Sequence, residues 1–361
     1  MTYSIEIERS TSPKQRPKED QLGFGKHFTD HMFIVDYETG KGWHAPRIVP
    51  YQGITLDPAA KIFHYGQSVF EGLKAYRAAE GRLLLFRPQD NFKRLNLSNE
   101  RMHMPEIDAE LAMAGLEELI RIDSDWIPSA PGTSLYIRPF VIATEPSLGV
   151  APSAKYQFII IMSPVGAYYA EGINPVKIYV ESGYVRAVKG GVGTAKTAGN
   201  YASGLKAQEE AAKRGCAQVL WLDGVHRKYI EEVGSMNVFF YIDGKVVTPS
   251  LSGSILDGIT RRSVIALLKE WNIPVEERTI SVDELFEAHE RGTLTEAFGS
   301  GTAAVISPIG ALYSENGDIE IGGGKTGELA AKVYDTLTGI QYGRVADPFG
   351  WTYELQVAAV K

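Results

Sequence analysis

The chain has 361 residues, of which 44% are hydrophobic and 22% charged, and its net charge is -7 at pH 7. This length predicts two domains with a sizeable core, and the negative charge disfavours nucleic-acid binding, which calls for a basic surface. The single Cys216 excludes an intramolecular disulfide and a thiolate metal cluster, and it fits a reducing compartment. Residues 1–20 lack the apolar centre of a signal peptide, and no apolar run is long enough to cross a bilayer. We therefore expect a cytoplasmic protein with no membrane partner.

Residues 1–165 read as a small α+β domain, because short strand-like runs outnumber helical ones. Its first 25 residues are predicted to form a loosely held, extended arm, because residues 10–20 are rich in Pro, Lys and Arg and have no periodicity. Two helices are expected, one with Asp90 as its N-cap and one over 108–122. The expected strands cover residues 31–35, 62–64, 72–77, 83–86, 134–143 and 156–163.

Residues 166–176 combine two glycines and one proline with two adjacent tyrosines, which is typical of an interdomain connector. The remaining residues, 177–361, form the expected large domain, in which strands alternate with longer helices. The expected strands are 176–180, 218–222 and 229–233, and the expected helices are 202–214, 259–271 and 326–337.

The most informative stretch is Gly-Gly-Val-Gly-Thr-Ala-Lys-Thr-Ala-Gly-Asn-Tyr over residues 190–201, which places Lys196 in a glycine-rich loop. Glycines let the backbone approach a ligand closely. A lysine in such a loop is either a phosphate binder or a nucleophilic amine.

As a phosphate binder, Lys196 would belong to a nucleotide site, with Asp223 after its strand imitating a metal-binding aspartate. The phosphate-loop pattern needs a glycine just before the lysine, where this chain has Ala195. It also needs an apolar strand leading into the loop, where polar residues 184–189 stand instead. Binding of Mg-ATP would support this alternative.

As a nucleophilic amine, Lys196 would form a Schiff base with a flat cofactor, for which small neighbours leave room. The loop resembles the cofactor-lysine motif of the branched-chain amino acid aminotransferases, which have the type IV fold of pyridoxal-phosphate enzymes. The resemblance continues in the family's order over nearly the whole chain, at residues 70–75, 85–88, 136–139, 145–149, 214–222, 232–237 and 298–303.

The resemblance implies a mixed α+β and α/β fold of two domains, a smaller α+β N-terminal one and a larger C-terminal one with a mixed, partly barrel-like sheet. It implies that Lys196 binds pyridoxal 5'-phosphate as a Schiff base and moves the substrate's α-proton. Glu232 would pair with the pyridine nitrogen, although its neighbour Glu231 argues for a surface position, because adjacent acids are usually exposed. The implied cofactor-binding residues are Arg94, Lys196, Tyr201, Glu232, Ser235, Ile259, Thr260 and Thr302.

Tyr136 and Arg138 are two residues apart in an expected strand and therefore share a face. By resemblance, Arg138 binds the distal carboxylate of glutamate, while aromatic residues hold a branched side chain. Without the family, these aromatics would equally suit ordinary core packing. The implied substrate-binding residues are Tyr65, Phe70, Tyr136, Arg138, Tyr168, Thr302 and Ala303.

The expected activity is ping-pong transamination between L-leucine, L-isoleucine or L-valine and 2-oxoglutarate, in a homodimer that uses no metal and binds no nucleic acid. The alternatives from the same fold are a D-amino acid aminotransferase and an aminodeoxychorismate lyase. A non-catalytic cofactor carrier is a further alternative, and it predicts bound cofactor without transamination.

Overall fold

The computed structural model describes residues 3–166, 173–315 and 317–355. The chain divides into two compact units. The first contains Met1–Ala170, Ala195–Ala198 and Gly339–Lys361, and the second contains Glu171–Thr194 and Gly199–Thr338. Within the described ranges, none of the helices is both long enough and apolar enough for a membrane span.

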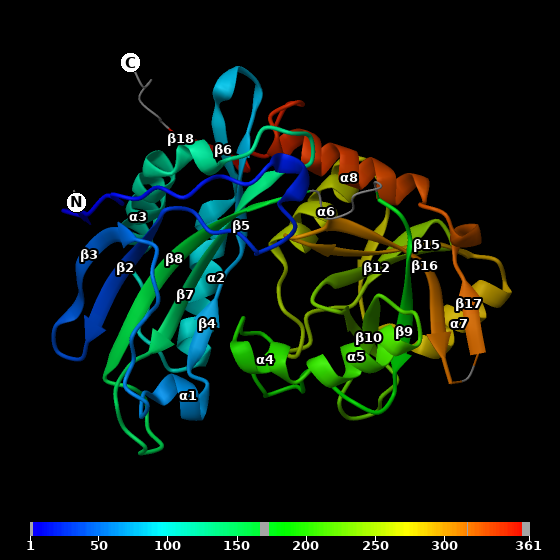
Figure 1. Ribbon diagram of the computed structural model, residues 1–361. Coiled ribbons are helices and arrows are strands. Elements are labelled where there is room, and N and C mark those ends of the chain that lie inside the picture. The colour runs from blue at the N-terminus through cyan, green and yellow to red at the C-terminus, as the bar shows by residue number, and fades with distance from the viewer. Residues whose placement is uncertain (1–2, 167–172, 316, 356–361) are drawn as a thin grey trace. The chain divides into compact units, whose positions relative to one another are not determined.

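A nine-stranded sheet organises the first unit, in the order β1-β3-β2-β8-β7-β5-β6-β18, with β4 also paired to β7 (Figure 1). All of its pairs are antiparallel except β1 with β3. The strands are β1 (Glu6–Ile7), β2 (His31–Glu38), β3 (Gly42–Pro50), β4 (Ser68–Phe70), β5 (Leu73–Arg77), β6 (Leu83–Phe86), β7 (Ser134–Ala143), β8 (Lys155–Val165) and β18 (Thr352–Leu355). The helices are α1 (Lys61–Tyr65), α2 (Pro88–Arg101) and α3 (Ala109–Ile122), with short 3-10 turns η1 (Glu19–Gln21), η2 (Ala79–Gly81) and η3 (Ser124–Trp126).

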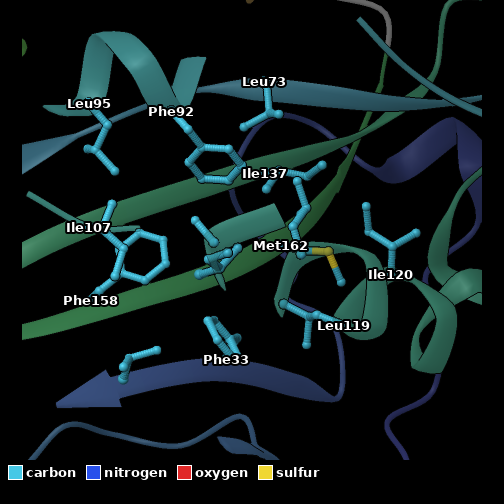
Figure 2. Close-up of a cluster of buried hydrophobic side chains, with 14 of the residues drawn as sticks. Phe33, Leu73, Phe92, Leu95, Ile107, Leu119, Ile120, Ile137, Phe158 and Met162 are labelled. Atoms are coloured by element: carbon cyan, nitrogen blue, oxygen red, sulfur yellow. The ribbon is translucent and has the colours of Figure 1, made fainter. Parts of the chain in front are cut away.

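The core of the first unit lies between this sheet and the helices α2 and α3, which contact β4 and β2 respectively. Alternation along β7 sends Leu135 and Ile137 into the core, both fully buried, and Tyr136 and Arg138 to the opposite face. Figure 2 shows labelled core side chains that come from the strands, the helices and, for Ile107, the segment between α2 and α3, namely Phe33, Leu73, Phe92, Leu95, Ile107, Leu119, Ile120, Ile137, Phe158 and Met162.

Two local expectations for this unit are wrong. Residues 62–64 form part of α1 and not a strand, because Gly66 at φ 59° closes a single helical turn by donating its N–H to the Ile62 carbonyl. Helix α2 begins at Pro88 rather than after an Asp90 cap, because proline at the first helical position sets the required φ.

The N-terminal arm is held more firmly than its composition predicts. Its β1 pairs in parallel with β3, and Ser10 N–H donates to His31 Nε2 at 2.9 Å. The Lys14 backbone N–H donates to Asp30 Oδ1 at 2.7 Å. Backbone hydrogen bonds of this kind do not depend on hydrophobic periodicity, so the sequence pattern carries no sign of them.

A second nine-stranded sheet organises the other unit, in the order β11-β10-β9-β16-β15-β12-β13-β14, with β17 also paired to β16 (Figure 1). It is mixed, because β9 pairs in parallel with both β10 and β16. The strands are β9 (Val176–Glu181), β10 (Gln218–Leu222), β11 (Ile230–Val233), β12 (Asn237–Ile242), β13 (Lys245–Thr248), β14 (Val275–Glu277), β15 (Leu294–Gly301), β16 (Val305–Ser314) and β17 (Gly317–Glu320). The helices are α4 (Ala198–Ala202), α5 (Leu205–Lys213), α6 (Ile259–Glu270), α7 (Val282–Glu290) and α8 (Glu328–Gln341), with the 3-10 turn η4 (Gly322–Gly324).

Helix α5 packs on β9 and β10, whereas α6 and α7 pack on β15. The strand expected at 218–222 is β10 without change, and the helix expected at 259–271 is α6 to within a residue. The helix expected at 202–214 is shorter, because α4 ends at Ala202 and α5 starts only at Leu205.

The last residues of the chain cluster with the first unit, although the sequence places them in the large domain. Strand β18 pairs antiparallel with β6, and Leu355 is buried in the first core. The expected connector at 166–176 lies largely outside the described residues.

Candidate active site

Lys196 belongs to the first unit and is fixed through its own backbone. Its carbonyl oxygen accepts a hydrogen bond from Phe70 N–H at 2.9 Å, and its N–H donates to Ser98 Oγ at 2.9 Å. The next residue is anchored too, since Thr197 Oγ1 donates to the Ser68 carbonyl at 2.6 Å. The glycine-rich loop therefore ends in a lysine whose main chain is held between β4 and α2.

The side chain of Lys196 faces an aromatic ring that also faces an arginine. Lys196 Nζ lies 4.7 Å from the centre of the Phe70 ring, and Arg138 Cζ lies 4.6 Å from it. Arg138 Nη2 also donates to the Tyr136 hydroxyl at 3.0 Å. Of the sequence-predicted residues, Lys196, Phe70, Tyr136 and Arg138 are thus brought together within the first unit.

The arrangement of Tyr136 and Arg138 depends on one glycine and leaves one polar atom unsatisfied. A Cβ on Gly72 would lie 2.1 Å from the Tyr136 hydroxyl, so any larger residue between β4 and β5 would displace the Tyr136 side chain. Arg138 Nε is buried and has no hydrogen-bond partner among the described residues. A buried N–H without a partner is rare, and it suits a site that receives an acceptor from a ligand.

Arg94 is buried on α2 and forms a two-point ion pair with Glu71. Its Nε and Nη2 lie 2.7 Å and 2.9 Å from the two oxygens of Glu71. Burial alone raises the pKa of Glu71, but the charge and hydrogen bonds of Arg94, with the charge of Lys196 and the Asn91 hydrogen bond, outweigh it. The pKa of Glu71 is therefore below its ordinary value, and an anion stands beside Lys196.

Two predicted substrate residues are not part of this cluster as described. Tyr65 lies at the end of α1, where its hydroxyl donates to the Leu148 carbonyl. Tyr168 falls outside the described residues.

Three predicted cofactor residues of the second unit line one polar recess. Tyr201, Glu232 and Ser235 line a recess of about 30 Å³. Its other walls come from Arg186, Asn200, Gly204, Gln208, Trp221, Gly234, Asn237 and Leu256.

Glu232 is 3% exposed on β11, where its Oε1 accepts a hydrogen bond from Leu256 N–H at 2.7 Å and lies 3.1 Å from Arg186 Nη2. Glu231 is 5% exposed, so the expectation that adjacent acids mark a surface is wrong here. Both carboxylates are inside because β11 is covered on its two faces, and each finds polar partners there.

The first turn of α6 presents backbone N–H groups, because Gly258 at the N-cap has no side chain to accept from them. Ile259 and Thr260 are both buried there, and a Cβ on Gly258 would lie 2.0 Å from Asn237 Oδ1. A helix start of this kind favours an anion.

Thr302 and Ala303 lie in the turn between β15 and β16, next to Ser300. Ser300 Oγ is buried without a hydrogen-bond partner among the described residues, and Ser300 is paired in register with Asn237. Asn237 also lines the recess formed by Tyr201, Glu232 and Ser235. The turn that carries Thr302 and Ala303 therefore follows a strand, β15, that is paired with a wall of this recess.

Sequence reasoning assigned no role to Glu71, Lys74 or Arg186. Lys74 is buried opposite Tyr136 in the β5–β7 register, and burial lowers its pKa to about 8. Glu71 lies in the run 70–75 that carries part of the family resemblance, but its partner Arg94 is on a separate helix. In the sequence, Arg186 stands in the polar run 184–189 before the glycine-rich loop. Its burial is recognisable only through its ion pair with Glu232, which is distant in sequence. The described ranges contain no group of three or more His, Cys, Asp or Glu residues that could hold a metal ion.

Residues 68–312 match the family described as amino-transferase class IV. The chain is 61% identical to branched-chain-amino-acid aminotransferase 2 of Bacillus subtilis (strain 168), over 98% of this chain and 97% of the relative. Among solved structures, it resembles the Escherichia coli branched-chain amino acid aminotransferase, with 28% identity, a TM-score of 0.73, and coverage of 90% of this chain and 98% of that chain. The branched-chain amino acid aminotransferase of Thermobaculum terrenum in its PLP form has 25% identity, the same TM-score of 0.73, and the same coverage.

Proposed function

Because the chain belongs to the class IV aminotransferases, and within them to the branched-chain amino acid aminotransferases, we propose that Lys196 is the residue through which it transfers amino groups. The enzyme is a transaminase of branched-chain amino acids that uses pyridoxal phosphate. Its fold is the type IV aminotransferase fold, a mixed α/β architecture with two sheets, as the sequence resemblance implied.

The chain's own residues fit the cofactor. The buried carboxylate of Glu232 suits a protonated ring nitrogen, and the first turn of α6, with no side-chain cap at Gly258, suits a phosphate. When bound, pyridoxal phosphate supplies a ring that accepts the electrons left on the substrate's α-carbon as its proton leaves. Tyr201, Ser235, Thr302 and Arg94 are proposed as further cofactor contacts.

One observation carries the proposal: Lys196 has a main chain fixed at two atoms and a side chain directed at the Phe70–Arg138 pair. A fixed amine can hold the cofactor covalently and then carry a proton at Nζ between the α-carbon and the cofactor. The carboxylate of Glu71 places an anion next to this amine, and the charge of Lys196 helps to lower the pKa of Glu71.

Substrate selection is proposed for Phe70, Tyr65, Tyr136, Arg138, Tyr168, Thr302 and Ala303. The buried Nε of Arg138 supports this, because it offers a donor to a carboxylate such as the distal one of glutamate. Phe70 and Tyr136 offer apolar surface to a branched side chain. With 2-oxoglutarate as acceptor, the two half-reactions share one site, which requires ping-pong kinetics.

A second copy of the chain is the proposed partner. Phe63, Leu148 and Val150 are 61%, 66% and 87% exposed, and the Tyr65 hydrogen bond to Leu148 holds α1 next to this loop. Exposed apolar side chains in one region are typical of a surface that another protein covers. Sedimentation of the purified protein as a dimer supports this assignment, and a monomer contradicts it.

The cytoplasm is the proposed location, because Cys216 is an unbridged thiol.

The test is steady-state kinetics with L-leucine and 2-oxoglutarate. Parallel double-reciprocal lines are expected for the wild type, and Lys196→Ala should lower kcat by at least about 10⁴-fold while its circular dichroism spectrum stays unchanged. Ordinary turnover by the variant contradicts the role of Lys196. Turnover of D-alanine without L-leucine instead identifies a D-specific enzyme.

A further inference from the structure

Strand β11 carries two neighbouring buried carboxylates, Glu231 and Glu232. Successive residues of a strand point to opposite faces, so the two groups leave the backbone in different directions. A buried carboxylate is costly unless a cation or several donors compensate it. The residues that compensate these two therefore control the state of both.

Arg186 is the cation that acts on both of them. Its Nη2 lies 3.1 Å from Glu232 Oε1, and the two side chains are 8% and 4% exposed. Its charge also acts on Glu231, whose pKa is raised by burial first and by the charges of Glu232 and Asp223, with Arg186 and Ser254 opposing the rise. One guanidinium thus serves two acids.

Ser254 fixes this arrangement from the other side and is itself buried. Its carbonyl oxygen accepts a hydrogen bond from Arg186 Nη2 at 2.6 Å, and its hydroxyl donates to Glu231. A Cβ on Gly193 would lie 2.2 Å from the same carbonyl oxygen. The loop before Lys196 therefore needs glycine at this point to pack against Ser254.

We propose that Arg186 is the positioning residue for the carboxylate that receives the cofactor's ring nitrogen. It pairs with Glu232 and fixes its Oε1, together with Leu256 N–H, while the Ser254 carbonyl fixes Arg186. This rests on the proposed function, in which Glu232 binds that nitrogen. Glu231 is the competing acid, because it draws on the same positive charge.

A purely structural ion pair is the alternative, since buried pairs of this kind often contribute little net stability. Two observations favour positioning. Arg186 and Glu232 line the same recess as Tyr201 and Ser235. Arg186 Nε is buried without a hydrogen-bond partner among the described residues, which a pair kept for stability alone has no reason to tolerate.

The experiment is a titration of the cofactor-free protein with pyridoxal phosphate, followed by absorbance from pH 5 to 9, in wild type, Arg186→Gln and Arg186→Lys. Loss of the cation lets Glu232 take up a proton at higher pH. The Kd of Arg186→Gln should rise at least about tenfold, and the acid limb of its Kd–pH profile should move up by about 1–3 pH units. Arg186→Lys keeps the charge but loses the fork geometry of the guanidinium. Its Kd and its acid limb should therefore lie between those of the wild type and those of Arg186→Gln.

Glu231→Gln gives a prediction of opposite sign. Removing the competing acid leaves all of the charge of Arg186 to Glu232, so the acid limb should move to lower pH than in the wild type. If the network were merely structural, Arg186→Gln and Glu231→Gln would both have lower melting temperatures, and the acid limbs of their Kd–pH profiles would not move in opposite directions. The matched control is Arg278→Gln, which breaks the two-point pair with Glu284 at 2.6 and 3.0 Å outside the recess and should keep the wild-type Kd.

The inference is overturned if Arg186→Gln has the Kd and the acid limb of the wild type. It is also overturned if the acid limb of Glu231→Gln moves to higher pH, as that of Arg186→Gln is expected to do. If Arg186→Gln does not fold, Arg186→Lys decides, and a wild-type profile in that variant overturns the inference. A wild-type protein that binds no pyridoxal phosphate contradicts the proposed function itself, which separates the two failures.

Discussion

Glu71 and Arg94 set the charge next to Lys196. The pair is fully inside the first unit and makes two short contacts, so it resembles a fork-to-fork arginine–carboxylate pair more than a surface ion pair. Breaking such a pair by removing one partner leaves an uncompensated buried charge. Glu71 is therefore both an electrostatic partner of Lys196 and a determinant of stability.

Glu71→Gln should lower the free energy of unfolding by about 3–5 kcal/mol at pH 7, because Arg94 loses its counter-charge. The pKa of Glu71 is depressed in the folded state. Its contribution is therefore complete above the ordinary carboxyl value of about 4.3 and declines as pH falls below it. Urea denaturation at pH 7 and pH 3.5 measures this, and the gap between wild type and variant should narrow at pH 3.5.

The control is Glu118→Gln, which breaks an i,i+3 pair with Arg121 on the surface of α3. Its loss should stay within about 1 kcal/mol at both pH values. Equal losses for Glu71→Gln and Glu118→Gln would contradict the account of the buried pair.

At the scale of single residues, the sequence predicted groups that motifs carry and missed groups that only distant partners define. Lys196 and Tyr136 stand in runs whose residue types suggest chemistry. Arg186 and Glu71 are recognisable only through partners 46 and 23 positions away, Glu232 and Arg94. Burial of a charged residue depends on such pairing, and spacing along the chain does not encode it.

At the scale of elements, α3 packs against β2 through a glycine. A Cβ on Gly115 would lie 2.3 Å from Phe33 Cζ and below 3 Å from two further atoms of the ring. Phe33 is completely buried, so its ring cannot move aside without disturbing the core. The close approach of helix and sheet thus depends on the missing side chain.

Gly115→Ala should destabilise the protein by about 1–2 kcal/mol, because overpacking outweighs the gain of about 1 kcal/mol in helix propensity. Thermal unfolding measures this, and Phe33→Leu in the same chain should recover part of the loss by making room. Gly53→Ala, where the added Cβ meets nothing within 4 Å, is the control. A Gly115→Ala protein more stable than wild type would disprove the tight contact.

The elements that the sequence predicted best are long or apolar throughout. β6, β7 and β10 have the bounds expected from their sequences, and α3 matches the expected helix over 108–122 except that Asp108 is its N-cap. The short helix α1 was mistaken for a strand because three apolar or aromatic residues give no period that separates the two. Strands β12 to β17 were not identified, since adjacent short strands with glycine or polar residues offer little alternation.

At the scale of the whole molecule, the order of the chain differs from the grouping of its parts. Residues 195–198 and 339–361 cluster with the first unit, although the former interrupt the second unit in sequence and the latter follow it. Strand β18 pairs with β6 across more than 260 positions of sequence, and no local sequence pattern predicts such a pairing. Lys196 consequently belongs to the unit that carries Tyr136 and Arg138, whereas Glu232 belongs to the other.

The most direct test of the central claim is the near-visible absorption spectrum of the purified protein with pyridoxal phosphate. We predict a band of the lysine-bound cofactor that disappears on addition of L-leucine and returns with 2-oxoglutarate, and that Lys196→Ala lacks from the start. A wild-type band that L-leucine leaves unchanged, or the same band in Lys196→Ala, would contradict the account.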